Sequence, residues 1–81
     1  MTRMNHNKAF GKALRKLRLN AKMSQDVLAM ESGLDRTFIS LLELGQRSPT
    51  LDTILALSTA LGMSMSHLVL VTEDILKDPN G

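Results

Sequence analysis

Apolar residues recur along this chain at intervals of three and four, the spacing that brings side chains onto one face of a helix. The first stripe consists of Phe10, Ala13, Leu14 and Leu17 and predicts a helix over residues 7–22. Later stripes predict four more helices, over residues 24–32, 35–44, 50–61 and from 64 or 66 onward. The apolar side chains expected to point inward in this later part are Leu28, Ala29, Leu34, Ile39, Leu42, Leu51, Ile54, Leu57, Leu61 and Leu68. The pattern therefore predicts an all-α fold of five helices.

Polar residues and glycines mark where these helices begin and end. The candidate N-caps, whose side chains can accept from the free N–H groups of a first turn, are Ser24, Asp35, Thr50 and either Ser64 or Ser66. The candidate stops are Gly33, Gly45 and Gly62. The short break at Gly33 predicts a tight turn between the second and third helices.

Composition narrows the class of protein. The chain has 81 residues, which indicates one domain, and with only two aromatic residues its core must be aliphatic. We expect residues 1–6 to be a flexible leader, residues 7–77 to be the domain and residues 78–81 to be a tail. The absence of cysteine excludes disulfides and thiolate metal sites and fits a reducing cytoplasm. No apolar run reaches the roughly 18 residues of a membrane span, and no signal peptide is recognisable, so we expect a cytoplasmic protein without membrane contact.

Charge is distributed unevenly along the chain. Residues 1–47 hold nine Lys or Arg and four Asp or Glu, a net charge of +5, whereas residues 48–81 hold one Lys and four Asp or Glu, a net charge of −3. A basic N-terminal half suits a protein that contacts phosphate groups. A solvated, charged helix near the N-terminus is the alternative interpretation.

Residues 24–47 carry the pattern with the clearest functional meaning. Two short amphipathic segments flank Gly33, and the second opens with Arg36 and Thr37. Arginine can bond to O6 and N7 of guanine together, and threonine can bond to a base or contact a thymine methyl group. This is the layout of a helix-turn-helix, whose second helix enters the DNA major groove.

Further landmarks extend the pattern over residues 7–70. They are Ser24-Gln25, Leu28-Ala29, Gly33, Ile39-Ser40, Leu42-Glu43, Gly45, Ser48-Pro49-Thr50-Leu51 and Ala60-Leu61-Gly62. With these residues the chain resembles the XRE-type helix-turn-helix family, which implies the five-helix, lambda-repressor-like fold shared with lambdoid phage repressors and Cro. The stretch LDRTFIS at residues 34–40 most resembles the controller proteins of restriction–modification systems.

The resemblance implies a set of DNA-contacting residues. The start of the recognition helix is expected on base edges, and the neighbouring residues are expected on the sugar–phosphate backbone. The set comprises Gln25, Arg36, Thr37, Ser40, Leu41, Arg47, Ser48, Thr50 and Thr53. Alternatives stay open at four positions: a solvated Gln25, an Arg36 that contacts phosphate or pairs with Asp35 or Glu31, a Ser40 bonded to its own helix, and a Thr50 that only caps.

Leu41 departs from the family pattern, in which a polar or charged residue often occupies this position. Leu41 either contacts a thymine methyl group or contacts no base. Alternatively, Leu41 and Leu44, which lies one turn along, dock a partner protein together. Glu43 would repel phosphate, and the resemblance implies that it forms a structural ion pair with Arg18 of the first helix.

The C-terminal segment holds more apolar residues than one small core can bury, and large exposed apolar patches usually mark an interface. The candidate dimer residues are Met65, Val69, Leu70, Val71 and Ile75. A two-fold dimer would present two recognition helices to a near-palindromic operator, so we expect a homodimeric repressor or activator that can regulate its own gene.

Nothing in the sequence indicates catalysis. His6 and His67 are the two histidines, and the chain has no HExxH, Ser-His-Asp or phosphate-binding glycine motif. We therefore expect no enzymatic activity, metal or cofactor. The expected partners are double-stranded DNA, a second copy of the chain, and RNA polymerase or a toxin protein. The competing hypotheses are an antitoxin of the same fold and a helical protein-interaction module that has lost DNA binding.

Overall fold

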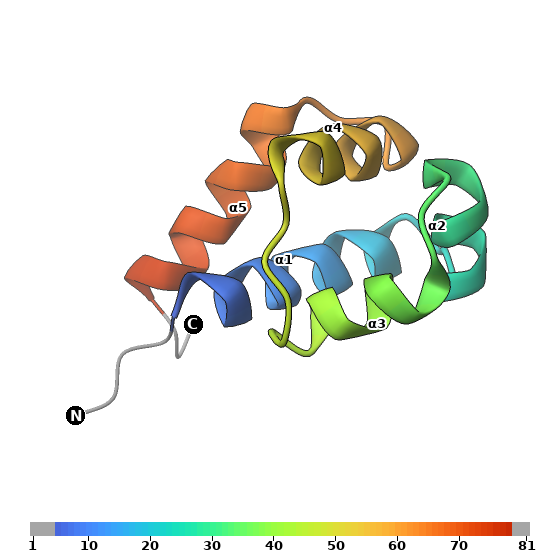
Figure 1. Ribbon diagram of the computed structural model, residues 1–81. Helices are drawn as coiled ribbons and strands as arrows, with labels where there is room; N and C mark the ends of the chain where they lie inside the picture. The colour runs from blue at the N-terminus through green and yellow to red at the C-terminus, as the bar shows by residue number, and fades with distance from the viewer. Residues whose placement is uncertain (1–4, 79–81) are drawn as a thin grey trace.

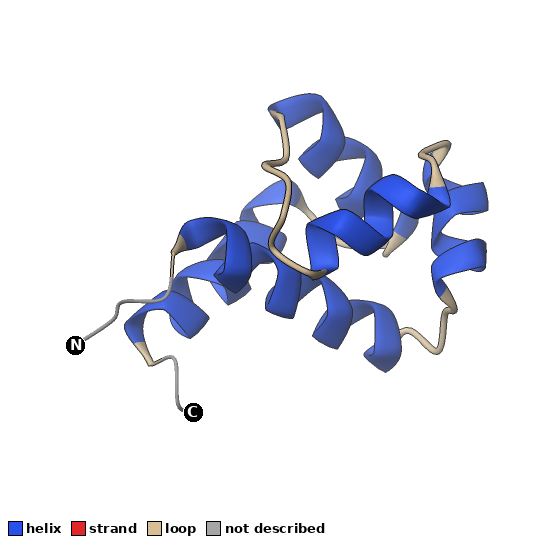
Figure 2. Ribbon diagram, turned by 60° about the horizontal axis from the view of Figure 1, so that its bottom comes forward, coloured by secondary structure: helices blue, strands red, loops and turns tan. Residues whose placement is uncertain are grey.

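The computed structural model describes residues 5–78, which form five helices and no strand (Figures 1 and 2). The helices are α1 (His6–Asn20), α2 (Gln25–Ser32), α3 (Arg36–Glu43), α4 (Leu51–Ala60) and α5 (Met65–Lys77). The predicted all-α, five-helix architecture is confirmed. Of the predicted leader and tail, residues 1–4 and 79–81 lie outside the described residues.

Side-chain caps begin the helices where the sequence predicts them. Oxygen atoms of Ser24, Asp35 and Thr50 each accept a hydrogen bond from the backbone N–H three residues further on. For the last helix the cap is Ser64, whose Oγ accepts from the N–H of His67 at 3.1 Å. Helix α1 begins one residue earlier than predicted, because Asn5 caps it and accepts from a backbone N–H at 2.8 Å. His6 therefore belongs to the helix and not to the leader.

Side chains from all five helices meet in one core. The largest fully buried apolar residues are Leu14, Leu28, Ile39, Leu42, Leu57 and Leu68, as predicted. Leu51 contradicts its prediction, since it is 73 % exposed instead of inward. It lies six positions before Leu57, which places it about 120° around the helix from that buried residue. Thr53 and Ser58 occupy the buried side of α4 instead.

Helix α1 supports α3, the predicted recognition helix. Helices α5 and α3 both pack along α1, and α2 lies against α3 and α4 at the far end of the molecule (Figure 1). The approach of α1 to α3 is close, because a Cβ atom at Gly11 would lie only 2.4 Å from the carbonyl oxygen of Leu42 and 2.6 Å from that of Glu43. This contact holds one side of α3 against the domain and leaves the opposite side in solvent.

Candidate nucleic-acid interface

Helices α2 and α3 form the helix-turn-helix, and residues 33–35 make the turn. Gly33 ends α2 with a φ of 72°, in the left-handed region that glycine adopts without steric cost. Leu34 then packs against the core. Because Ile39 and Leu42 are buried, the turn and the core together fix which face of α3 is left outside.

The outward face of α3 carries the predicted base-reading residues. Thr37 and Leu44 are exposed, and Ser40 and Leu41 are partly exposed. Leu44 is 60 % exposed, so its apolar surface is not used by the core. The face therefore presents two hydroxyl groups followed by two leucines.

Four predicted residues come together in one place. Gln25, Arg36, Thr37 and Ser40 line an open pocket of about 170 Å³. The pocket lies where the first residue of α2 meets the first turns of α3. Its lining offers an amide, a guanidinium and two hydroxyls, which are the groups that bond to phosphates and base edges in DNA.

Arg36 forms an ion pair with Asp26 of α2. Its Nε lies 3.2 Å from Oδ1 of Asp26, which corrects the predicted alternatives Asp35 and Glu31. The first turns of α2 and α3 face each other across the pocket, and this arrangement brings the two side chains together. They are 63 % and 74 % exposed, and ion pairs of that kind contribute little energy. Arg36 can therefore leave Asp26 for a base or a phosphate.

The predicted ion pair between Arg18 and Glu43 is confirmed. Arg18 Nε lies 2.7 Å from Glu43 Oε2 and its Nη2 lies 3.0 Å from Oε1, with side chains only 6 % and 4 % exposed. Arg18 also donates to the carbonyl oxygen of Met23 at 2.9 Å. The hydrogen bond to Glu43 raises the pKa of Arg18, although burial opposes this. The carboxylate of Glu43 is thus neutralised within the fold and does not face the solvent side of α3.

The same carboxylate orients Gln25. The Nε2 atom of Gln25 donates to Glu43 Oε1 at 3.1 Å, so a continuous set of hydrogen bonds joins Arg18, Glu43 and Gln25. These three residues come from α1, α3 and α2. A second amide hydrogen of Gln25 is left for a phosphate oxygen. The side chain is therefore held in one orientation at the mouth of the pocket.

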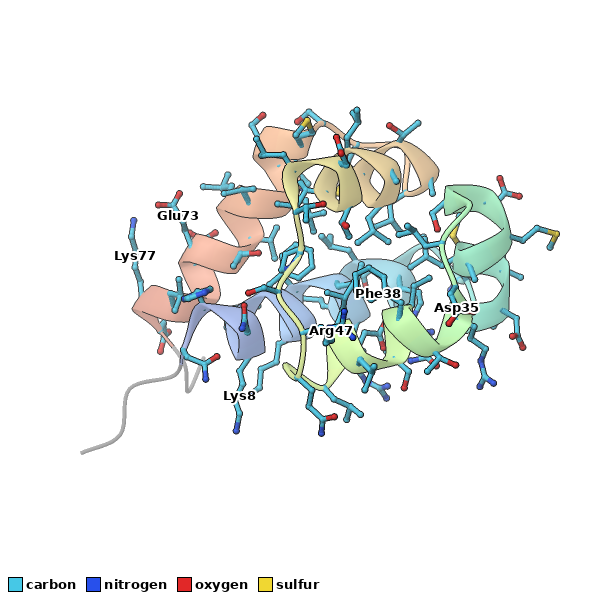
Figure 3. The ribbon with its side chains drawn as sticks, in the orientation of Figure 1. Lys8, Asp35, Phe38, Arg47, Glu73 and Lys77 are labelled. Carbon is cyan, nitrogen blue, oxygen red and sulfur yellow. The ribbon has the colours of Figure 1, made fainter. Side chains whose placement is uncertain are left out.

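The loop after α3 is attached at two points. Ser48 Oγ donates to Asn7 Oδ1 of α1 at 2.7 Å. The guanidinium of Arg47 lies over the ring of Phe38, with Cζ 5.5 Å from the ring centroid (Figure 3). Sequence reasoning missed Asn7 and Phe38, because the first contact spans 41 positions and the second depends on how the loop turns back. No local spacing signals either contact.

The side chains of Thr50 and Thr53 form hydrogen bonds at the start of α4. Thr50 Oγ1 accepts from the backbone N–H of Thr53 at 3.1 Å and lies 3.0 Å from the hydroxyl of Thr53. Thr53 is only 7 % exposed. The predicted cap at Thr50 is confirmed, and the buried hydroxyl of Thr53 lies beside it.

The predicted dimer residues divide between two environments. Val69 and Leu70 are exposed on α5, whereas Val71 packs against the core and Met65 and Ile75 are partly buried. Of the five predicted dimer residues, Val69 and Leu70 are therefore the two that present exposed apolar surface.

Helix α4 adds exposed apolar surface that the sequence pattern does not predict. Leu51 and Leu55 are both exposed on it. Ile54 of α4 and Val69 of α5 line a groove of about 280 Å³ together with Pro49 and with residues of α1, which are His6, Asn7 and Phe10. The exposed apolar surface thus extends over both helices.

Within residues 5–78 there is no group of three or more His, Asp or Glu side chains placed to hold a metal ion. In the same part of the chain no single helix is long and apolar enough to cross a membrane. Helices α4 and α5 reach that length and hydropathy only together, across a break where the chain bends by 103°.

Comparison with known proteins identifies the family. Residues 14–68 match the family model described as Helix-turn-helix. This chain belongs to the helix-turn-helix family. The matched region runs from within α1 to the start of α5, so it includes the recognition helix and both residues of the Arg18–Glu43 pair. The predicted family resemblance is confirmed.

Within the helix-turn-helix family, the chain is similar to restriction–modification controller proteins. Control protein C.BamHI of Bacillus amyloliquefaciens is 44% identical over 61 residues, which cover 74% of this chain and 75% of that protein. The crystal structure of the controller protein C.AhdI from Aeromonas hydrophila has 44% identity and a TM-score of 0.75 over 76% of this chain and 94% of its own. The controller protein C.Esp1396I, a tetramer in complex with its natural 35 base-pair operator, has 25% identity and a TM-score of 0.84 over 93% and 99%. The predicted resemblance to the controller proteins of restriction–modification systems is confirmed as well.

Proposed function

We propose that this chain is a sequence-specific regulator of transcription that binds double-stranded DNA through the outward face of α3. The pocket formed by Gln25, Arg36, Thr37 and Ser40 carries this proposal. It joins hydrogen-bonding side chains to the N-terminal end of α2, where free N–H groups favour a phosphate. The likeness to C.BamHI and to the operator-bound C.Esp1396I favours a regulator over the antitoxin and protein-interaction hypotheses.

The proposed contacts follow from exposure and from position on α3. Arg36, Thr37 and Ser40 face base edges in the major groove, and Leu41 contacts a thymine methyl group. Gln25 bonds to a backbone phosphate at the edge of the groove. Arg47 and Ser48, on the loop after α3, contact the same backbone further along.

We propose that two copies bind together through the exposed apolar surface of α4 and α5. Leu55 and Val69 are 52 % and 41 % exposed, and burying them against a second copy would remove apolar area from water. A two-fold pair places its recognition helices about 34 Å apart, on successive turns of one face of DNA. Binding over a promoter represses, and binding beside it can recruit RNA polymerase. We propose a non-enzymatic role, in the cytoplasm, where the DNA of its bacterial relatives lies.

The variant Arg36→Ala tests the reading role directly. We expect operator binding to weaken by about 1–3 kcal/mol and the preference at one base-pair position to disappear, because the bidentate contact to a base is lost. Fluorescence anisotropy on a panel of single-base operator variants measures both quantities.

A matched control is Lys77→Ala, which removes the same charge at the far end of α5, well away from α3 (Figure 3). It is expected to leave both affinity and base preference close to native. Equal weakening of Arg36→Ala on every sequence would assign Arg36 to a phosphate and contradict base reading.

A further inference from the structure

Phe38 is one of two aromatic residues in the chain, and the guanidinium of Arg47 lies over its ring. Phe38 lies in α3 next to Thr37 and is partly buried against the core. The Arg47 guanidinium is 5.5 Å from its ring centroid, within the range in which a cation is attracted to an aromatic face (Figure 3). The position of Arg47 is therefore coupled to the recognition helix.

The backbone on both sides of Arg47 is also fixed. The N–H of Gln46 donates to the carbonyl oxygen of Leu41 at 2.9 Å, which ties the loop to α3. On the other side, Ser48 is bonded to Asn7 of α1. The long side chain of Arg47 is exposed, and the ring of Phe38 beneath its guanidinium limits its rotation.

Phe38 is itself firmly placed. Its N–H donates to the Asp35 cap at 3.3 Å, and its ring packs on the core. An arginine that is already ordered loses less conformational entropy when it binds than a freely rotating one. A guanidinium held at the edge of the reading face therefore meets a DNA phosphate at a lower entropic cost.

We propose that Phe38 is a positioning residue, which holds the Arg47 guanidinium in place for a backbone phosphate beside the recognition helix. The proposal rests on the proposed DNA-binding function. It assigns Phe38 a role through Arg47 and no base contact of its own.

The test is a double-mutant cycle on a DNA site selected by the native chain. Phe38→Leu keeps an apolar side chain but removes the ring, Phe38→Tyr keeps the ring, and Arg47→Ala removes the cation. Phe38→Leu is expected to raise Kd by about two- to fivefold, whereas Phe38→Tyr is expected to leave Kd at its native value. With Arg47→Ala present, Phe38→Leu is expected to change Kd no further.

Salt titration identifies what Arg47 contacts. Arg47→Ala is expected to lower the slope of log K against log salt by about 0.9, the loss of one phosphate contact. An unchanged slope, or a lost preference at one base, would overturn the phosphate assignment. An equal effect of Phe38→Leu with and without Arg47 would overturn the positioning role and leave Phe38 as packing.

A measurement without DNA keeps the proposal testable if Phe38→Leu folds poorly. In the native chain the side-chain protons of Arg47 should show an upfield NMR shift from the ring current, and Phe38→Tyr should preserve it. Absence of that shift in the native chain would overturn the inference. Failure of the native chain to bind any DNA in a salt-dependent way would instead overturn the proposed function, while the ring-current shift would stay.

Discussion

Glu43→Ala is expected to lower the free energy of unfolding by about 3–5 kcal/mol, because it leaves the Arg18 guanidinium buried without a counter-ion. The two side chains are only 6 % and 4 % exposed, so water does not replace the lost carboxylate. In the same variant Gln25 loses the acceptor that orients its side chain at the mouth of the pocket between α2 and α3. Urea denaturation followed by far-UV circular dichroism measures the change.

The matched control replaces both charges at once, as Arg18→Met with Glu43→Leu. Removing a buried pair in favour of apolar residues is often neutral or stabilising, so much of the loss is expected to be recovered. A loss below about 1 kcal/mol for Glu43→Ala alone is typical of exposed pairs and would contradict the burial argument.

The pH dependence of this pair has a definite sign. The hydrogen bond to Glu43 raises the pKa of Arg18 above its ordinary value, so folding favours the protonated form. Its contribution is fully present below that ordinary value and is lost only at still higher pH. Arg18 therefore stays charged at neutral pH and acts as a permanent structural cation.

Gly11→Ala is expected to destabilise the domain by about 3 kcal/mol, the upper part of the range for overpacked sites. The new Cβ would lie 2.4 Å and 2.6 Å from two backbone carbonyl oxygens of α3, and neither can move without shifting the recognition helix. The usual gain from alanine in a helix interior, about 1 kcal/mol, does not offset this clash. Calorimetry should show a fall in Tm of roughly 12–24 °C for a domain of this size.

Gly33→Ala serves as the comparison. A Cβ at Gly33 meets nothing within 4 Å, but its φ of 72° strains a side-chain-bearing residue. We expect a loss of about 1–2 kcal/mol there, smaller than at Gly11. A Gly11→Ala variant as stable as the native chain or more stable would show that α1 and α3 are not in close contact.

Local features of the fold could be predicted from the sequence because they depend on neighbours along the chain. The helix caps Ser24, Asp35 and Thr50 and the buried stripe of α1 follow from spacing alone. The Arg18–Glu43 pair could be anticipated only through the resemblance to a known family, since 25 positions separate its members.

Features that depend on how helices meet could not be predicted in this way. Gly11 is ordinary in the sequence, and only the distance from α1 to α3 reveals its importance. The pairing of Arg36 with Asp26 depends on which turns face each other across the pocket. For the same reason Val71 faces the core although it stands beside Leu70 in one apolar run. Sequence patterns predicted which side chains of α3 face outward, but the contacts that support this face come from tertiary packing.

We propose that two copies of this chain read one near-palindromic DNA site with paired α3 helices. Selection of binding sites from random DNA, carried out with the native chain and with Val69→Glu, measures whether they do. Sedimentation and circular dichroism establish that the variant is a folded monomer. For the native chain we expect two inverted half-sites with centres about 10–10.5 base pairs, or a multiple of that spacing, apart. For Val69→Glu we expect at most a single weak half-site. A native chain that selects one asymmetric site, or no sequence at all, would contradict the claim.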